Sequence, residues 1–365
     1  MTPASRTADR LARLRARMGR TGTDLLALAP GAHMRWLLGF TPHPDERLCL
    51  LLVTPQTAAF VMPALNAQDA RQHSALPFHA WDDAEGPAAA LSAALAATDP
   101  APRRLSLDET MRADHALMLI DALPDAARSL AAEEVGALRL IKDADELAGL
   151  AENARIADAA QAAVRAALRP GVSEAEMVQV ARDAFAAEGA HCLFALIAFG
   201  ENAAYPHHHS GARRLAAGEA VLVDIGGRRG AQVSDITRMA ALGTPPEGYA
   251  EVHAVVEAAV QAALAAIRPG VEARAIDAAA RGVIEAAGFG PQFTHRTGHG
   301  LGIEVHEPPW MTATNPERLE EGMVFTVEPG IYLPGRFGIR LEEVAVVTAT
   351  GARILSGLPR DLHVA

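Results

Sequence analysis

The sequence predicts an α/β (α+β) fold in two domains, and three observations support this prediction. Half of the 365 residues are hydrophobic, which is enough to build a large core without disulfides. Short helical and strand patterns alternate through roughly the first 130 residues. The remainder of the chain contains an internal repeat. We therefore expect a smaller α/β domain over residues 1–132 and a larger domain over residues 133–365.

The first domain is predicted to begin with an amphipathic helix. Its arginine-rich start lacks the apolar segment of a signal peptide, and Leu11, Leu14 and Met18 fall at helical spacing. An alanine-rich run over residues 88–97, with Pro87 just before it, predicts another helix. Short apolar runs predict strands over residues 25–28, 49–53, 58–62 and 105–107. The histidines of this domain are scattered, so we expect no catalytic site in it.

Composition limits the classes of partner. The chain has 44 acidic and 33 basic residues, and this balance disfavours nucleic acids because phosphate binding needs a cationic surface. Cys49 and Cys192 are far apart and form no CxxC pair, so we expect a reducing, cytoplasmic compartment. No apolar run is long enough to cross a membrane, and no membrane partner is expected.

The larger domain is predicted to open with a long helix and to contain two related halves. Asp143 followed by Glu146 forms a capping box that begins the helix. The motif Arg-Pro-Gly-Val occurs at residues 169–172 and again at 268–271, and each copy should end one helix and start another. A duplication with a purely structural role is the alternative. The equivalent positions that follow are His207 and His306, Leu215 and Leu319, and Asp224 and Glu328.

Two aspartates lie on neighbouring predicted strands. Residues 221–223 predict a buried strand that ends at Asp224, Gly226 and Gly227 predict the turn, and the returning strand carries Asp235. This hairpin would place both carboxylates at one side of a sheet. Without a cation the two would repel, and one would be forced neutral. For this pair alone, a structural hairpin and a metal site fit equally well.

Three histidines occur close together in HRTGHGLGIEVHEPP, among glycines that let backbone approach a ligand. His299 can complete a carboxylate-rich shell, whereas His295 and His306 can donate to a substrate carbonyl or a leaving group. In the histidine triplet at residues 207–209, only the first has a repeat partner, so the other two are expected to be solvated.

The glutamate at position 342 lies on a predicted strand that continues through the apolar residues 344–347. Strand alternation puts Arg340 and Glu342 on one face and Glu343 on the other. A surface ion pair between Arg340 and Glu342 is the alternative. The core-like run that follows favours burial near a metal.

Four carboxylates and one imidazole together form a hard-donor set, which suits two divalent cations held close together. Two cations that share a water are a standard hydrolytic device. The five candidate metal ligands are Asp224, Asp235, His299, Glu328 and Glu342.

Five ordered motifs resemble those of the metallopeptidases of the pita-bread fold: VLVDIGG, SDITR, HRTGHGLGIEVHEPP, FTVEPGIY and GIRLEE. The likeness is strongest to Xaa-Pro peptidases, meaning prolidase and aminopeptidase P. In the N-terminal domain, residues 35–40 resemble a further family segment. The resemblance implies a C-terminal pita-bread catalytic domain with a pseudo-twofold repeat, preceded by a smaller creatinase-like domain. One departure, at residues 230–233, would alter the pocket wall without removing a ligand.

The resemblance also implies roles for the candidate ligands. Asp224 would hold one metal, His299 and Glu328 the other, and Asp235 and Glu342 would bridge them. The cofactor would be two divalent ions, with Mn²⁺ expected first and Co²⁺ or Zn²⁺ as alternatives. Glu328 would also be catalytic as the proton shuttle.

Other residues would act on the substrate. The resemblance makes His207 and His306 contacts of the substrate and its tetrahedral intermediate, and His295 a further catalytic histidine. A dipeptidase also needs a cation for the free C-terminal carboxylate, and Arg336 and Arg340 are the candidates.

We therefore expect hydrolysis of the bond before proline in short proline-containing peptides, by an Xaa-Pro dipeptidase or aminopeptidase. The family resemblance also implies a homodimer. The alternatives are a catalytically silent peptide-binding protein of the same fold and a lyase that acts on a small metabolite.

Overall fold

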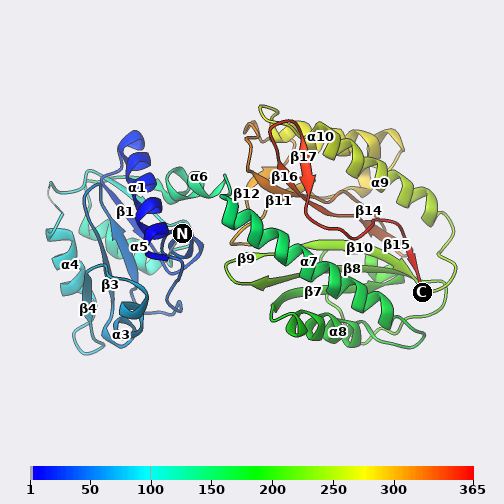
Figure 1. Ribbon diagram of the computed structural model, residues 1–365, viewed down its shortest axis with the longest axis horizontal. Coiled ribbons are helices and arrows are strands. Elements are labelled where there is room, and N and C mark those ends of the chain that lie inside the picture. The colour runs from blue at the N-terminus through cyan, green and yellow to red at the C-terminus, as the bar shows by residue number, and fades with distance from the viewer. Residues whose placement is uncertain (1–2, 99) are drawn as a thin grey trace. The chain divides into compact units, whose positions relative to one another are not determined.

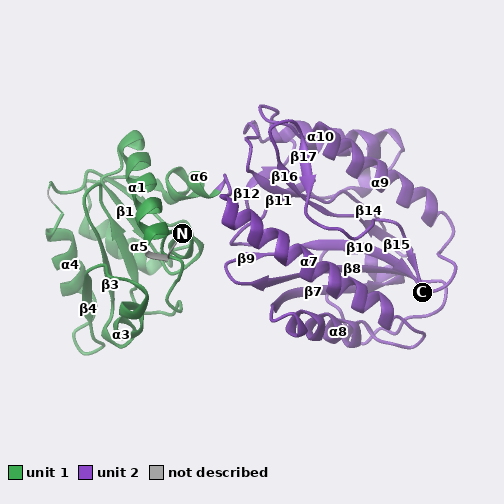
Figure 2. Ribbon diagram, in the orientation of Figure 1, with its two compact units in different colours: residues 1–139 green, residues 140–365 purple. Residues whose placement is uncertain are grey.

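The computed structural model describes residues 3–98 and 100–365, and the chain divides into two compact units, residues 1–139 and 140–365 (Figure 2). The second unit starts later than residue 133, where the sequence placed the boundary. The intervening residues form η1 (Ala131–Glu133) and α6 (Val135–Arg139), and α6 contacts α1 (Pro3–Thr21) and α2 (Ala32–Leu38). This packing makes the segment part of unit 1.

Unit 1 is a six-stranded sheet with helices around it (Figure 1). The strand order is β4-β3-β2-β1-β5-β6, in which β2 is antiparallel to both β1 and β3 and the other pairs are parallel. The strands are β1 (Leu25–Leu28), β2 (Leu50–Val53), β3 (Ala58–Pro63), β4 (Phe78–Trp81), β5 (Arg104–Leu107) and β6 (Ala127–Leu130). The remaining helices are α3 (Ala64–His73), α4 (Ala88–Ala96) and α5 (Ala113–Ala122).

The predicted elements of unit 1 are present, and the strands that the sequence missed lie at the edges of the sheet. Leu11, Leu14 and Met18 of α1 are buried, as their helical spacing predicted. β4 and β6 were not predicted. They lie at the two edges, where β4 is mostly half-buried and β6 is largely exposed, so their sequences lack the apolar run that marks a buried strand.

Unit 2 begins with a helix pair that packs on a mixed sheet, antiparallel except for the parallel pair of β10 and β18. The predicted capping box is present: Asp143 accepts from the backbone N–H of Glu146, and the Glu146 side chain accepts from that of Asp143. Sheet order is β18-β10-β8-β7, with β9 paired to β8. These elements are α7 (Ala144–Ala167), α8 (Glu174–Ala187), β7 (His191–Phe199), η2 (Gly200–Ala204), β8 (Ala220–Arg229), β9 (Gln232–Val233), β10 (Ile236–Ala241) and β18 (His363–Val364).

A second helix pair and a second sheet follow. The sheet order is β12-β11-β13-β16-β17, and β14 and β15 form a separate hairpin. Figure 1 shows α9 and α10 along one side of the strands and α8 along the other. These elements are α9 (Tyr249–Ala266), α10 (Ala273–Ala286), η3 (Gly290–Gln292), β11 (Gly298–Gly300), β12 (Glu307–Met311), β13 (Val324–Val327), β14 (Gly330–Leu333), β15 (Phe337–Arg340), β16 (Glu343–Val347) and β17 (Ala352–Ile354).

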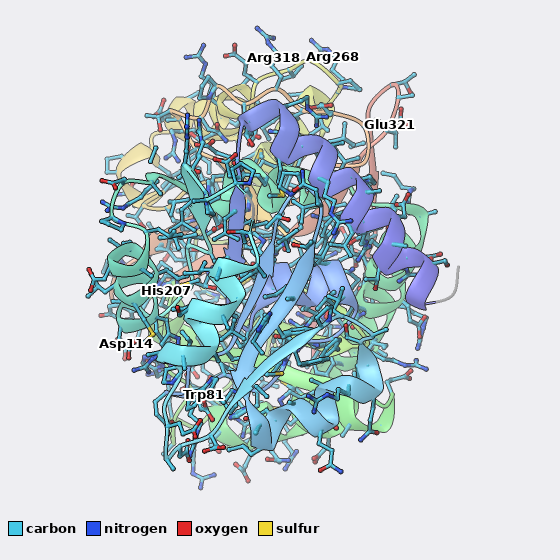
Figure 3. All side chains as sticks on the ribbon, turned by 90° about the vertical axis from the view of Figure 1, so that its left-hand side faces the viewer. Trp81, Asp114, His207, Arg268, Arg318 and Glu321 are labelled. Carbon is cyan, nitrogen blue, oxygen red and sulfur yellow. The ribbon has the colours of Figure 1, made fainter. Side chains whose placement is uncertain are left out.

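Matching hydrogen bonds relate the two halves of unit 2. In the first half, the glycine of the Arg-Pro-Gly-Val motif donates its backbone N–H to Leu215, and in the second half the equivalent glycine donates to Leu319, both at 2.8 Å. Arg318 also donates to the carbonyl of the second glycine at 2.7 Å, and Figure 3 shows it beside Arg268 of the motif. The sequence repeat therefore corresponds to repeated local structure.

The aspartate hairpin is longer than predicted. β8 passes through Asp224 and continues past Gly226 and Gly227, which the sequence analysis wrongly assigned to a turn. A Cβ at Gly226 would lie 2.3 Å from the ring of Phe194, and one at Gly227 would lie 2.4 Å from the ring of Phe185. These glycines therefore make room for aromatic rings inside the strand. The chain turns at residues 230–231 and returns through β9 and β10.

The strand predicted around residue 342 is two strands in different sheets. β15 pairs with β14, and β16 pairs with β13, so Glu342 lies in the link between them. Glu343 points away from Glu342, as alternation predicted, and pairs with the buried Arg238 at 2.8 Å. Arg340 is buried as well, which excludes the alternative of a surface pair with Glu342.

Two further findings concern the whole chain. Within the described residues, none of the helices has the length and apolarity that crossing a membrane requires. Both Cys49 and Cys192 are free thiols.

Candidate metal centre and active-site pocket

Five ligand-type side chains converge on one cavity in unit 2. Its volume of ≈ 770 Å³ lies in the range of small-molecule sites. Asp224 comes from the middle of β8, Asp235 from the link between β9 and β10, and His299 from β11. Glu328 follows β13, and Glu342 lies between β15 and β16. The fold therefore brings five side chains that are dispersed in the sequence to the wall of one cavity.

Arg340 forms an ion pair with one carboxylate oxygen of Asp224. Its Nη2 lies 2.5 Å from Asp224 Oδ2, and it also donates to the hydroxyl oxygens of Tyr332 at 2.9 Å and Thr237 at 3.1 Å. The other oxygen of Asp224 is buried and has no hydrogen-bond partner among the described residues. Burial raises the pKa of Asp224, and the charge of Arg340 opposes this rise. One carboxylate oxygen is therefore free to act as a ligand.

Asp235 and Glu342 are crowded by other carboxylates. Burial raises the pKa of both groups well above its usual value, and the charge of Asp224 raises both further. Thr237 donates to one oxygen of Glu342 at 2.8 Å, while the other is buried without a partner in the part of the chain that the structure describes. Such crowding is unfavourable unless a cation offsets the negative charge.

His299 is oriented with one ring nitrogen toward the acidic cluster. Its Nδ1 lies 3.1 Å from the carbonyl of Gly300, so an Nδ1–H donor there leaves Nε2 as the lone-pair nitrogen. That Nε2 lies 3.0 Å from Glu328 and 3.8 Å from Asp235. In the metal-free protein, Nε2 carries a proton when His299 is charged: burial disfavours the charged form of Glu328, but the hydrogen bond and charge of this protonated His299 lower the pKa of Glu328 to about 2. Thr326 also donates to this carboxylate at 2.9 Å.

The residues present fit a pair of divalent cations. Their ligand atoms form overlapping groups of three, each with all atoms within 4.8 Å of one another. Two buried carboxylate oxygens in these groups have no hydrogen-bond partner among the residues that the structure describes, and the donor chemistry is that of hard divalent ions. The groups that contain only the five candidates are His299, Glu328 and Glu342, and Asp224, Asp235 and Glu342.

The substrate-side histidines differ in their surroundings. His295 lies 2.8 Å from the Tyr332 hydroxyl, and burial lowers its pKa. His207 and His306 line the cavity and are exposed to solvent. Although His306 is exposed overall, its ring centre lies 4.0 Å from that of His299, and partial desolvation of the ring lowers the pKa of His306 to about 4. Both pKa shifts favour the neutral imidazole, whose ring nitrogens can donate or accept a hydrogen bond.

The structure corrects three expectations. Arg336 is exposed, donates to the carbonyl of Glu247 at 2.8 Å, and is not among the described residues that line the cavity. His208 is not simply solvated, because its Nε2 lies 2.9 Å from the buried Glu174. Residues 230–233 do not form the pocket wall, since the described lining residues do not include them.

Several residues of the site escaped the sequence analysis. Tyr332, Thr237 and Thr326 act by holding other side chains, a role that has no signature in one sequence. Tyr332 lies two residues after the Pro-Gly of the motif FTVEPGIY, which is the one signal that could have found it. Arg296, inside HRTGHG, lines the cavity and was also overlooked.

Comparison with known proteins agrees with this geometry. The family described as metallopeptidase family M24 matches residues 148–349, and the creatinase/prolidase N-terminal domain matches residues 10–141. The N-terminal unit is thus creatinase-like, and the C-terminal unit has the pita-bread fold of that metallopeptidase family.

Relatives match over nearly the whole length. A probable dipeptidase PepE of Mycobacterium tuberculosis is 37% identical over 98% of this chain and 96% of its own. An Xaa-Pro dipeptidase of Lactobacillus delbrueckii subsp. lactis is 31% identical over 94% of this chain and 95% of its own. The crystal structure of a recombinant prolidase from Thermococcus sibiricus superposes with a TM-score of 0.92 and 31% identity, covering 98% of both chains.

Proposed function

Because this chain belongs to metallopeptidase family M24, we propose that it is a metal-dependent peptidase that hydrolyses the bond before proline in dipeptides and other short peptides. The observation that carries the proposal is the convergence of four carboxylates and one imidazole on a single cavity, where two buried carboxylate oxygens have no hydrogen-bond partner within the described part of the chain. The names of the relatives, an Xaa-Pro dipeptidase and a prolidase, supply the substrate class.

The proposed ligands divide between two cations. We assign Asp224 to one ion, His299 and Glu328 to the other, and Asp235 and Glu342 to both. Bound cations would neutralise the carboxylate cluster and supply the Lewis acidity that amide hydrolysis requires. We propose Mn²⁺ as the resident ion, and Co²⁺ and Zn²⁺ as alternatives, because oxygen donors outnumber nitrogen donors in this set.

The protein's own groups would orient the peptide and move protons. Glu328 is the proposed general base, and Thr326 and His299 fix its carboxylate. His207 and His306 would donate hydrogen bonds to the scissile carbonyl as negative charge develops on it. His295, oriented by Tyr332, would donate a hydrogen bond to the nitrogen of the leaving group.

The other walls of the cavity suit a small apolar ring. Phe194, Leu196, Pro206 and Val305 line it together with the polar groups. A proline side chain carries no hydrogen-bonding group, so such walls bury it without leaving a polar atom unpaired.

The test is turnover of a proline dipeptide by metal-loaded protein. The purified chain is stripped of metal, reloaded with Mn²⁺, Co²⁺ or Zn²⁺, and given Ala-Pro with Ala-Ala as the matched control. We expect cleavage of Ala-Pro well above Ala-Ala, and adding Ala-Pro-Ala distinguishes a dipeptidase from an aminopeptidase. Folded protein that leaves every Xaa-Pro peptide intact with all three ions would refute the proposal.

A further inference from the structure

Two arginines line the cavity, and one of them is already committed to protein partners. Arg340 donates to Asp224, to Tyr332 and to Thr237, so its charge and most of its donors are used inside the site. Arg336, the other arginine that the sequence suggested, lies outside the cavity. Neither is therefore available to a substrate anion.

Arg296 differs from both. It lines the cavity and is partly buried. Within the residues that the structure describes, its guanidinium forms no ion pair and no hydrogen bond. Its Cζ instead lies 4.5 Å from the centre of the Trp310 ring. Stacking of this kind holds a guanidinium plane in place while leaving its N–H edge open.

The position of Arg296 keeps its charge beside the proposed metal centre. It lies two residues before the start of β11, and Trp310 on β12 is the ladder partner of His299. Burial lowers the pKa of Arg296 while the charge of Glu328 raises it, and the charge of Arg296 in turn helps to lower the pKa of His306. The charge of the guanidinium therefore interacts with two proposed catalytic groups, Glu328 and His306.

Glu328 acts on Arg296 through space, but none of the described carboxylates contacts the guanidinium, so its N–H donors can pair with the negative charge of a ligand. In an Xaa-Pro dipeptide, the C-terminal carboxylate lies about one residue beyond the scissile carbonyl, within ~3.6 Å along the chain. A carboxylate matches the forked donors of a guanidinium. A longer peptide presents a neutral amide at the same place.

We propose that Arg296 binds the C-terminal carboxylate of the substrate and thereby makes the enzyme prefer Xaa-Pro dipeptides to longer peptides. The inference rests on the proposed function and deepens it by naming the substrate class. Trp310 is the positioning residue that presents the guanidinium.

The test compares a free carboxylate with an amide. The metal-loaded wild type and Arg296→Gln, Arg296→Lys and Arg336→Gln variants are assayed with Ala-Pro and Ala-Pro-amide. Arg296→Gln should raise KM for Ala-Pro by roughly 10- to 100-fold, which is the loss expected for a charge-assisted hydrogen bond. The Arg296→Gln change should alter kcat for Ala-Pro less than KM, and it should leave KM and kcat for Ala-Pro-amide unaffected. Arg296→Lys should restore part of the preference, and Arg336→Gln, which removes an exposed arginine outside the cavity, should match the wild type.

A binding measurement separates this inference from the proposed function. The probe is the Ala-Pro analogue whose scissile amide is reduced to CH₂–N, prepared as free acid and as amide, and calorimetry of the metal-loaded protein gives Kd. The acid should bind the wild type at least about 10-fold more tightly than the amide, and Arg296→Gln should abolish the difference. This readout needs no turnover, so an inactive wild type would refute the peptidase and still decide the role of Arg296.

Four results would overturn the proposal. The first is an acid-over-amide preference that survives Arg296→Gln. The second is an equal loss for acid and amide, which would indicate a general structural role. The third is wild-type protein that binds neither analogue or does not distinguish them. If Arg336→Gln removes the preference instead, the carboxylate site is at Arg336.

Discussion

Asp224 illustrates how a side chain acquires its role from its immediate neighbours. One oxygen is held by Arg340, and the other is buried with no hydrogen-bond partner in residues 3–98 and 100–365. Neither feature can be read from the sequence, where Asp224 and Arg340 are 116 residues apart. The sequence predicted which donor types are present, because carboxylates and histidines in ordered motifs are visible there. It did not reveal that Tyr332 and Thr237 hold Arg340 in place.

At the residue scale, Asp235→Asn should have opposite effects on activity and on the metal-free fold. The change removes a proposed bridging carboxylate, so kcat should fall by more than the ~10- to 100-fold typical of losing an outer partner of a metal ligand. The same change relieves repulsion among Asp235, Glu342 and Asp224. Metal-free Asp235→Asn should therefore unfold at a higher temperature than metal-free wild type. Calorimetry and steady-state kinetics measure the two effects.

The outcome that contradicts this assignment is equally specific. Turnover close to wild type in Asp235→Asn would remove this residue from the proposed ligand set. A metal-free variant that unfolds at a lower temperature would show that repulsion is not the dominant interaction of Asp235.

At the scale of elements, buried and amphipathic segments were predictable and segments defined by tertiary contact were not. α1 followed from the spacing of its buried leucines and methionine. β8 was predicted too short because Gly226 and Gly227 are typical of turns, whereas here they accommodate the rings of Phe194 and Phe185. The requirement for glycine came from partners that the local sequence does not show.

Gly226→Ala tests the packing of β8. The added Cβ would lie 2.4 Å from the carbonyl oxygen of Ser234, which is backbone and cannot rotate away. The free energy of unfolding should therefore fall by about 1–3 kcal/mol or more. Gly282→Ala is the matched control, because this exposed helical glycine has open space around it and should gain up to ~1 kcal/mol. Equal denaturation midpoints for the two variants would contradict this account.

The start of α8 predicts a pH dependence of stability. Glu174 accepts hydrogen bonds from Asn202, His208 and the backbone N–H groups of Phe199 and Gly211. Burial raises its pKa, but these donors outweigh burial and lower the pKa below the usual 4.5. A lowered folded pKa stabilises the protein above about pH 4.5, and this stabilisation is lost as the pH falls through the folded value.

The variant Glu174→Gln checks this prediction. Urea denaturation from pH 7 down to acid should show the wild type more stable than the variant at pH 7, with a difference that shrinks below about pH 4.5. A difference that stays constant across this range would mean that ionisation of Glu174 contributes nothing.

At the scale of the whole molecule, the internal repeat was the most informative sequence feature. It predicted two similar halves, and the matching hydrogen bonds at Leu215 and Leu319 show that they exist. Family M24 membership follows from motifs that match most of the second unit. The division between the units lies at residue 140 rather than 133, because short helical segments are assigned to a unit by packing. The homodimer stays a prediction.

The central claim is that two divalent cations bind in this cavity and make the protein an Xaa-Pro peptidase. The most direct test is titration of Mn²⁺ into metal-free protein while Ala-Pro hydrolysis and bound metal are measured in the same samples. We predict that activity rises from the metal-free baseline and reaches its plateau at about two ions per chain, the number that a two-metal site requires. Hydrolysis that proceeds undiminished in the metal-free protein, or no hydrolysis once two ions are bound, would contradict the account.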